Sequence, residues 1–331
     1  MGVTRRQALA LTAGLAALPR AALAEAPPPP IFADLGVPDG PACEQAIDHG
    51  ADFLIAPVAA TKDGGLVVAP DVELSPFTDV ARRPEFADRR RDATVEGAAV
   101  SGWFTQDFTL TELKSLVTGA PRGGDHTAPP TLLGLADVID LARSGSVRQA
   151  RVVGISPRLV RPAFHAAQEL GLERRLADAI RQAGYDWAAA AIFIQSSEPA
   201  ALKTMAGLSA ARRIQLVGAE GGPEDPAALR YQDMIQPDGL ALVKSWASGI
   251  GPAESLLIQP VQKGAIVSTG LAGGAHAAGL KVYARADAQT SRTRLTALFL
   301  AGADGVMAAD VGQAVRARGE AINRLRGGSG G

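Results

Sequence analysis

The sequence "ADFLIAPVAATKDGGLVVAPD" (residues 51–71) contains two short apolar runs on either side of a polar turn. The runs, 52–56 and 66–69, have the length and the aliphatic content of buried strands. Longer Ala- and Leu-rich segments with helical spacing lie between such runs along the rest of the chain. Eight strands that alternate with helices predict a parallel sheet. The other six runs are 31–34, 151–155, 191–195, 213–217, 281–284 and 304–307.

The strand number favours a closed (β/α)8 TIM barrel over an open doubly wound sheet, because no Gly-rich dinucleotide-binding loop follows the first strand. The junctions "HGADFLI" (49–55) and "AGADGVM" (301–307) each place a Gly where a left-handed helix cap is expected. A ninth candidate strand, "SGIGP" (248–252), is short and is expected to be irregular. The interval 72–150 is too long for one crossover, so it predicts an insertion over the barrel mouth between the third and fourth strands.

The N-terminus predicts export. Arg5 and Arg6 directly precede an apolar run (8–19), and "ALA" at 22–24 suits signal-peptidase cleavage, so residues 1–24 are expected to be a signal peptide. The paired arginines favour a twin-arginine signal over an ordinary secretory one. After signal removal no membrane span is expected, and the protein should be periplasmic or secreted. The remaining divisions are a Pro-rich spacer (25–30), the barrel (31–318) and a flexible tail (319–331).

Charge and cysteine content exclude two classes of site. The 33 Lys and Arg residues and the 34 Asp and Glu residues give a net charge of −1, which lacks the basic footprint of a nucleic-acid binder. The run "RRPEFADRRR" (82–91) is interpreted as a solvated loop, with a phosphate-attracting rim as the alternative. The single cysteine, Cys43, excludes an internal disulfide and a cysteine metal cluster.

Six stretches together resemble the exported branch of the glycerophosphodiester phosphodiesterases, in order and spacing, over about residues 31–315. They are "GADFLIAPVAATKDGGLVVAPD", "FTDV" (77–80), "DFTLTELKSL", "GISPRLVRPAFH" (154–165), "IFIQSSEPAALKTM" (192–205) and "SGIGP". The resemblance implies a barrel of the phospholipase-C-like phosphodiesterase type, which uses calcium to split glycerophosphodiesters into glycerol 3-phosphate and an alcohol. Such chemistry needs two histidines as acid and base, and carboxylates that hold the cation.

The positions at which the resemblance implies this chemistry hold other residue types. The expected His-Arg pair of the first strand falls on Asp34 and Leu35, and the second histidine falls on Pro70. The expected metal-binding carboxylates fall on Ile55, Pro57 and Arg158, which cannot ligate calcium. The resemblance therefore implies a degenerate member with no confident catalytic residue, no metal ligand and no cofactor. Calcium is expected only if the chain is active.

A positive charge near the implied metal position suggests a different use of the mouth. The guanidinium of Arg158 can bind a phosphate or carboxylate without a metal, which predicts a site for a small anionic or glycerophosphodiester-like ligand. The alternative is that Arg158 pairs with Asp34 or Asp71 across the mouth and closes it. The candidate ligand-binding residues, at predicted strand ends and the loops after them, are Arg158, Lys62, Asp71, Tyr283, Arg285 and Asp310.

The four histidines, His49, His126, His165 and His276, are expected to be structural or exposed. Three functions then compete. The first is an exported binding or interaction protein that has lost catalysis. The second is a working phosphodiesterase that uses unidentified residues. The third is a structural partner of other envelope proteins.

Overall fold

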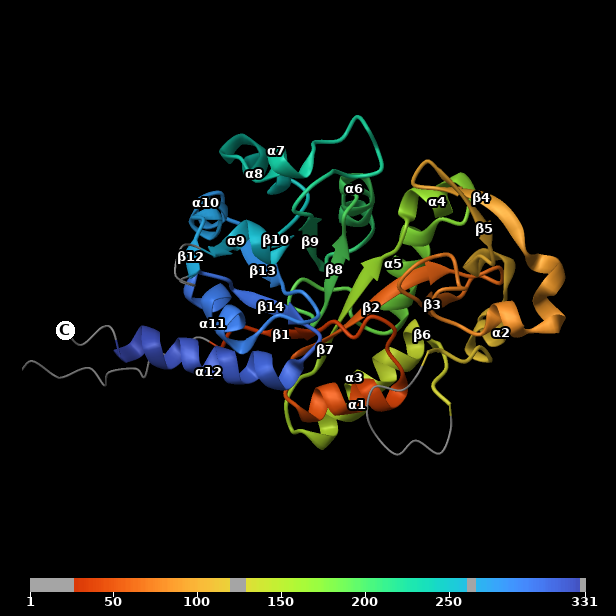
Figure 1. Ribbon diagram of the computed structural model, residues 1–331, viewed down its shortest axis with the longest axis horizontal. Coiled ribbons are helices and arrows are strands. Elements are labelled where there is room, and N and C mark those ends of the chain that lie inside the picture. The colour runs from red at the N-terminus through yellow and green to blue at the C-terminus, as the bar shows by residue number, and fades with distance from the viewer. Residues whose placement is uncertain (1–26, 120–128, 261–265, 328–331) are drawn as a thin grey trace, which may run out of the picture.

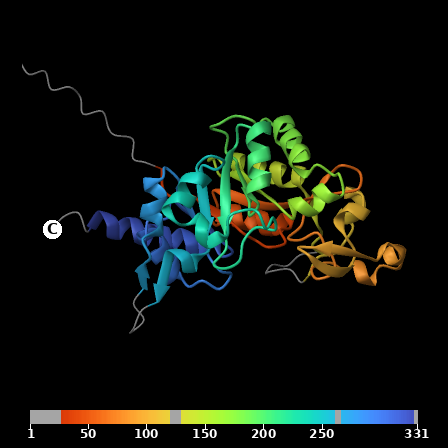
Figure 2. The same cartoon turned by 90° about the horizontal axis from the view of Figure 1, so that it is seen from above.

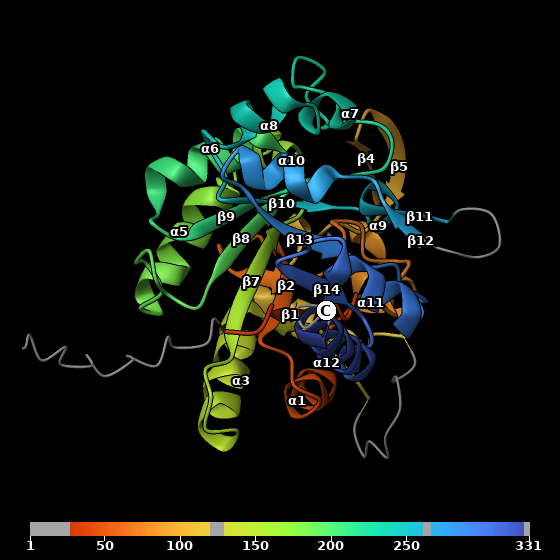
Figure 3. The same cartoon turned by 90° about the vertical axis from the view of Figure 1, so that its left-hand side faces the viewer.

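The computed structural model describes residues 27–119, 129–260 and 266–327, and the predicted signal peptide lies outside these ranges. Eight parallel strands follow one another in the order β1-β14-β13-β10-β9-β8-β7-β2, and β1 also pairs with β2, which closes the barrel (Figure 3). The predicted (β/α)8 barrel is confirmed. Its strands are β1 (Ile31–Ala33), β2 (Phe53–Ala60), β7 (Gly154–Leu159), β8 (Phe193–Ser196), β9 (Arg212–Val217), β10 (Gly249–Pro252), β13 (Lys281–Arg285) and β14 (Gly305–Ala308).

One predicted barrel strand is wrong, and another takes its place. The run 66–69 forms β3 (Leu66–Val68), which pairs antiparallel with β2 and with β6 (Leu133–Gly134), outside the barrel. The eighth barrel strand is β10, in the stretch "SGIGP" that was expected to be irregular. Its glycines are required by close packing, because a Cβ on Gly249 would lie 2.7 Å from the Lys281 carbonyl oxygen. A strand made of small residues carries a weak sequence signal.

Helices surround the barrel and connect successive strands (Figure 1). They are α1 (Gly40–Asp48), α3 (Leu135–Arg148), α4 (Pro162–Ala167), α5 (Leu172–Gln182), α6 (Pro199–Leu208), α7 (Tyr231–Met234), α8 (Pro237–Val243), α9 (Glu254–Leu257), α10 (Leu271–Ala277), α11 (Arg292–Leu300) and α12 (Val311–Gly327). Residues 319–327 were predicted to belong to a flexible tail, but they continue α12, which ends at Gly327 and has Ala321 buried. Residues 328–331 lie outside the described ranges. In the described residues no helix is long and apolar enough to cross a membrane.

Aromatic side chains fill the barrel interior toward the N-terminal ends of the strands. The rings of Phe32, Phe53, Phe193 and Tyr283 contact one another with centroid distances of 4.8 to 5.4 Å. Glycines on neighbouring strands make room for them, since a Cβ on Gly154 would lie 2.4 Å from the Phe53 ring. Tyr283 is therefore 7% exposed and belongs to this core, not to the mouth where it was predicted.

The helix-to-strand junctions at 49–55 and 301–307 share one backbone conformation and one hydrogen-bond pattern. Gly50 and Gly302 both have a φ of +98°, as expected for left-handed caps. Two residues later, Asp52 accepts a hydrogen bond from the backbone N–H of Ile31, and Asp304 accepts one from Val282, each over 2.9 Å. Each aspartate thus fixes the start of the neighbouring strand, which explains why the "GAD" sequence occurs at both sites.

The segment between β2 and α3 forms a lobe with its own core at the end of the molecule away from the end of α12 (Figures 1 and 2). It includes β3 and β6, the hairpin β4 (Arg91–Val95) and β5 (Ala98–Gly102), and α2 (Leu110–Lys114). Three 3-10 turns, Val80–Arg82, Pro84–Arg89 and Thr105–Asp107, complete it. Much of the basic run 82–91 is neutralised there, because Arg83 pairs with Asp79, Arg89 with Glu112 and Arg91 with Asp107.

Candidate ligand site at the barrel mouth

Arg158 lies on β7 at the C-terminal ends of the barrel strands, beside Pro57 of β2 in the sheet register. Its Nη2 donates to Oδ2 of Asp34 over 2.6 Å, and its Nε donates to Oε1 of Gln195 over 3.1 Å. The side chains of Arg158 and Asp34 are only 22% and 28% exposed. Of the two arrangements considered from the sequence, the structure contains the one in which Arg158 pairs with Asp34 across the mouth.

The amide of Gln195 is held in one orientation by a buried chain of hydrogen bonds. Its Nε2 donates to Oγ of Ser156 over 2.7 Å, and that hydroxyl donates to the carbonyl oxygen of Phe193 over 2.8 Å. The amide oxygen is then directed at Arg158. Sequence analysis missed both polar residues. The signal that could have found Ser156 is its position two residues before Arg158, which places both side chains on the same face of a strand.

Arg285, at the end of β13, brings a second guanidinium to the mouth. Burial, and then the nearby charge of Arg158, lower the pKa of Arg285, whereas Asp34 and the exposed Asp287 act in the opposite direction. Its Nη2 contacts the carbonyl oxygen of Val217 at 3.5 Å, and its buried Nε has no hydrogen-bond partner in the described residues. Arg285 therefore lies close enough to the Arg158–Asp34 pair for both charges to act on its guanidinium.

Asp71 pairs with Arg161, not with Arg158. Nη2 of Arg161 lies 2.9 Å from Oδ2 of Asp71, while its Nη1 contacts Glu96 at the tip of the β4–β5 hairpin and lies 3.7 Å from Glu224. Burial, and then the charge of Glu198, raise the pKa of Glu224. Arg161 thus connects three loops around the mouth. Sequence analysis missed it, because its left-handed φ of +46° directly before a proline has no sequence signal.

The remaining predicted residues do not join Arg158. Lys62 has an exposed side chain in the β2–β3 turn, and its backbone N–H donates to the Phe108 carbonyl oxygen. Burial raises the pKa of Tyr283 to about 12, as expected for a phenol inside the barrel. Asp310 accepts hydrogen bonds from the backbone and side chain of Gln313 in the first turn of α12, which lower its pKa. Pro70 is exposed in the loop after β3.

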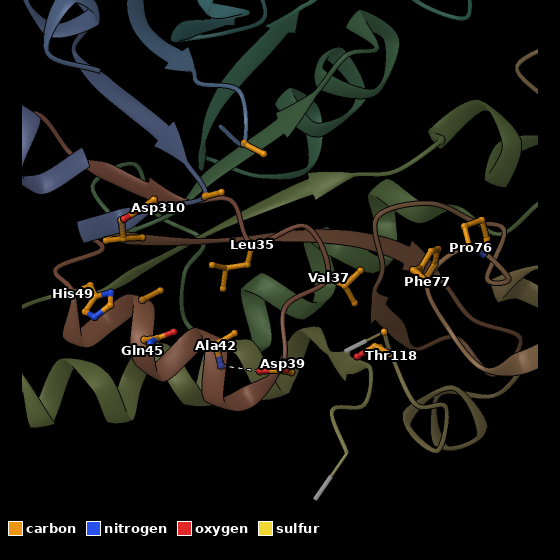
Figure 4. Close-up of a pocket in the computed structure, with 15 residues that line it drawn as sticks. Leu35, Val37, Asp39, Ala42, Gln45, His49, Pro76, Phe77, Thr118 and Asp310 are labelled. Carbon is orange, nitrogen blue, oxygen red and sulfur yellow. Dashed lines mark hydrogen bonds between the residues drawn. The ribbon is translucent and has the colours of Figure 1, made fainter. Parts of the chain in front are cut away.

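A pocket of about 610 Å³ lies between α1, the start of α12 and the inserted lobe. Leu35, which directly follows Asp34, lies near the centre of its lining (Figure 4). His49 and Asp310 lie toward one end of the pocket, and Pro76 and Phe77 lie at the other (Figure 4). The pocket is therefore linked to the mouth through Leu35, and its lining combines apolar with polar side chains.

Comparison with known proteins identifies the barrel. A model of the glycerophosphoryl diester phosphodiesterase family matches residues 41–312. The chain belongs to this family. Glycerophosphodiester phosphodiesterase GDPD6 of Arabidopsis thaliana is 30% identical over 260 residues, which cover 73% of this chain and 68% of that protein. A glycerophosphodiester phosphodiesterase of Haemophilus influenzae is 25% identical over 242 residues, which cover 64% of this chain and 64% of that protein, less than two thirds of its length.

Solved structures of the family share the fold. A glycerophosphodiester phosphodiesterase from Agrobacterium tumefaciens matches with a TM-score of 0.56 at 14% identity, over 87% of this chain and 99% of that one. An Oleispira antarctica phosphodiesterase, solved in complex with the product sn-glycerol-3-phosphate, matches with a TM-score of 0.59 at 18% identity, over 88% and 96% of the two chains. At these identities the likeness concerns the barrel alone.

The mouth of this family member does not fit a calcium ion. Ile55 is 2% exposed and packs in the barrel interior, and the side chain of Pro57 has no oxygen. The third implied ligand position is filled by the cation of Arg158, which repels a metal ion. Among the described residues, no group of three or more His, Cys, Asp or Glu could hold a metal ion.

The described histidines do not form the acid–base pair that the family resemblance implies. His165 is fully buried, and Ala60 N–H points at its Nε2 over 3.4 Å. His276 lies at the N-terminal face of the barrel, where its Nε2 is 2.6 Å from Oδ2 of Asp304. His49 lies at the end of α1 and lines the pocket. His126 lies outside the described residues.

Proposed function

We propose that this chain is a non-catalytic member of the glycerophosphodiester phosphodiesterase family, which binds a small anionic or glycerophosphodiester-like ligand at the barrel mouth. The observation that carries the proposal is the Arg158–Asp34 ion pair of 2.6 Å. It occupies two positions at which the resemblance implies a metal ligand and a catalytic histidine. Asp34 is engaged with Arg158, and it stands where the resemblance implies a histidine that moves a proton to or from the reacting groups.

The loss of rate expected from these replacements is large. Removing an acid or base costs roughly 10²–10⁴-fold in rate. A bound cation contributes several kcal/mol of transition-state stabilisation in metal-assisted phosphoryl chemistry, and Ile55 and Pro57 supply no oxygen to hold one. We propose accordingly that the chain carries no cofactor.

Ligand binding is supported by the charge at the mouth. Arg285 lies close enough to the Arg158–Asp34 pair for both charges to act on it, and its Nε has no hydrogen-bond partner in the described residues. A phosphate monoester or diester presents oxygens that match guanidinium groups bidentately. The organic part of such a ligand would enter the neighbouring pocket past Leu35, toward the end that holds Asp310.

We propose further that the protein is exported to the periplasm or the medium. The support is in residues 1–24, where Arg5 and Arg6 precede the apolar run 8–19. Fractionation of cells that make the full chain tests this. Recovery of the protein in the cytoplasm with residues 1–24 still attached contradicts export.

Retained catalysis is the second candidate, and the 30% identity to the plant phosphodiesterase favours it. The two candidates are separated by incubating the purified chain with glycerophosphocholine, with calcium or with a chelator, and measuring glycerol 3-phosphate. The proposal predicts no release above the protein-free background in either condition. Calcium-dependent release that the chelator abolishes overturns the loss of catalysis.

Binding is tested separately, by the thermal shift of the chain with glycerol 3-phosphate and with inorganic phosphate. Both should stabilise the chain, and Arg285→Gln should abolish the shift. Arg82→Gln is the matched control, because Arg82 is exposed in the inserted lobe. An equal shift for Arg285→Gln and Arg82→Gln places the anion elsewhere and contradicts this site, as does the absence of any shift.

A further inference from the structure

The exposed large apolar side chains of the barrel are gathered on one face. In a (β/α)8 barrel each helix runs back along the barrel, so the helix C-termini and the loops that follow lie at the N-terminal face. Among the residues that the structure describes, six of the seven exposed large hydrophobic side chains lie there, and the seventh, Val267, lies on a hairpin that leaves the C-terminal end of β10. The six are Val147, Val152, Trp187, Leu242, Leu300 and Leu325.

Single exposed apolar residues are ordinary, so their distribution is what matters here. Random scatter would place them on both ends of the barrel and on the outer helix faces. Val147 and Val152 are 85% and 72% exposed, and Trp187 is 56% exposed. These three side chains are therefore exposed over more than half of their surface.

Three of these residues, Val147, Val152 and Trp187, lie in neighbouring helix-to-strand connections. Val147 and Val152 flank the end of α3 before β7, and Trp187 lies in the connection from α5 to β8. Strands β7 and β8 are neighbours, and Nη2 of Arg143 in α3 donates to the Ala183 carbonyl oxygen over 2.6 Å, which joins the two connections. Ala188 and Ala189 beside the tryptophan are also exposed. Exposed apolar side chains from two neighbouring connections therefore lie on this face.

The charges on the same face are mainly positive where they are exposed. Asp52, Asp186 and Asp304 in the helix-to-strand connections are partly buried and accept hydrogen bonds or ion pairs, and the exposed Asp48 at the end of α1 pairs with Arg148. The cations Lys244 and Arg324 are exposed at the ends of α8 and α12. Exposed cations beside exposed apolar side chains, among them a tryptophan, complement a bilayer with anionic headgroups.

The chain also enters the barrel at this face. The Pro29 carbonyl oxygen accepts from Nη1 of Arg318 over 3.0 Å, and Val306 N–H donates to the Pro30 carbonyl oxygen over 3.0 Å, directly before β1. The described chain therefore begins at the N-terminal face and not at the barrel mouth.

We propose that the N-terminal face of the barrel binds the surface of a bilayer that contains anionic lipids, with Trp187, Val147 and Val152 at the level of the headgroups. This contact leaves the mouth and its pocket directed away from the membrane. It does not depend on the ligand site, because it uses the opposite end of the barrel.

Tryptophan fluorescence of the full chain tests the proposal. The chain has three tryptophans, of which Trp103 and Trp246 are buried, so quenching by a lipid-borne group reports on Trp187. With vesicles of phosphatidylglycerol and bromine-labelled phosphatidylcholine, the emission of Trp187 should be quenched. The matched control carries Val267→Trp in a Trp187→Phe background, which moves the exposed indole to the β11 (Ile258–Pro260) and β12 (Ile266–Ser268) hairpin, and its emission should stay unquenched.

Vesicle sedimentation gives the second measurement. The variant Val147→Ser/Val152→Ser/Trp187→Ser should bind vesicles at least about tenfold more weakly than the parent, since binding scales with the apolar area transferred. The control Val267→Ser should bind as the parent does. Equal quenching at Trp187 and at the hairpin, or equal binding of all variants, shows that the N-terminal segment alone holds the vesicle and overturns the proposal. A blue shift of Trp187 emission with protein concentration and no vesicles assigns the face to a second copy and also overturns it.

Discussion

Nη2 of Arg158 lies 2.6 Å from Oδ2 of Asp34, and the pair joins β7 to β1 over the intervening strand β2. At the crossing point β2 presents Pro57, whose side chain has no atom that could compete for the guanidinium. Arg285 is close enough to this pair for the charge of Arg158 to lower its pKa and for the charge of Asp34 to raise it. Asp34 therefore offsets charge on both arginines, whereas Arg158 offsets the charge of Asp34 and adds to the positive charge near Arg285.

That asymmetry predicts unequal effects of removing the two partners. Asp34→Asn leaves two neighbouring guanidinium groups without their main counter-charge, whereas Arg158→Gln also relieves the repulsion on Arg285. Asp34→Asn should lower the free energy of unfolding more than Arg158→Gln, and the double-mutant coupling should be about 1 kcal/mol for a partly exposed pair. Urea unfolding of the four chains measures both quantities. A coupling of zero means that the pair is not formed in solution.

A second prediction concerns the pH dependence of stability. Burial, and then the charge of Arg175, lower the pKa of His165 from its ordinary 6.5 to about 4. The unfolded chain therefore binds this proton more tightly than the folded chain does. The free energy of unfolding should fall as the pH drops from about 6.5 to about 4, by about 3 kcal/mol, and this contribution should be constant below pH 4.

The control for this prediction is His165→Gln. Its amide oxygen can still accept from the Ala60 N–H, but the side chain does not titrate. The variant should lose the slope between pH 6.5 and pH 4 in urea unfolding followed by circular dichroism. If the variant and the parent keep the same slope, another group is responsible and the assignment to His165 is wrong.

A third prediction concerns the glycines of the barrel interior. A Cβ on Gly154 would lie 2.4 Å from the Ala191 carbonyl oxygen and 2.4 Å from the Phe53 ring, so Gly154→Ala should cost about 2–3 kcal/mol by overpacking. Gly207→Ala is the matched control, because Gly207 lies in α6 with open space around its Cα, and the change should stabilise by about 0.5–1 kcal/mol. Thermal unfolding measures both. Similar effects of the two changes would contradict the close packing around Phe53.

The barrel could be predicted from the sequence because its strands are continuous apolar runs between helices. The count of eight was right, but one member was wrong. The run 66–69 has a strand's composition, and nothing local distinguishes an antiparallel partner of β2 from a barrel strand. Conversely, "SGIGP" lacks the bulky residues of a strand, because Leu216 and Tyr283 of its neighbours fill the space beside Gly251 and Gly249.

From the sequence it was possible to predict which residue types stand at the implied metal positions, but not which side chains pair with one another. The absence of an acid pair on β2 and the presence of Arg158 are local facts, and their consequence for a metal follows directly. The partner of Arg158 was predicted only as one of two carboxylates, because choosing Asp34 over Asp71 requires the geometry of the mouth. Arg161 and Gln195 had no signal, since their roles arise from backbone conformation and from buried contacts between strands.

The last prediction restores what the family resemblance implies. In the variant Ile55→Glu/Pro57→Asp/Arg158→Glu, carboxylates project from β2 and β7 at neighbouring positions, because Pro57 and Arg158 are paired in the sheet register. Without calcium these carboxylates repel one another and Asp34, so the variant should melt below the parent. Calcium should stabilise the variant, by about 2.7 kcal/mol at a free concentration of 100 times its Kd, and should leave the parent unchanged.

The control for this restoration is Ile55→Glu/Pro57→Asp, which keeps Arg158. A guanidinium beside the new carboxylates compensates their charge, so this variant should respond to calcium much less than the triple variant does. Thermal melts with calcium, with magnesium and with a chelator measure the difference. If the triple variant gains no calcium-dependent stability although it folds, the three positions do not converge on one point, and the register that places Ile55, Pro57 and Arg158 at the implied metal site is wrong. If the parent itself gains stability from calcium, the chain holds the ion through other residues, and the non-catalytic proposal loses its main support.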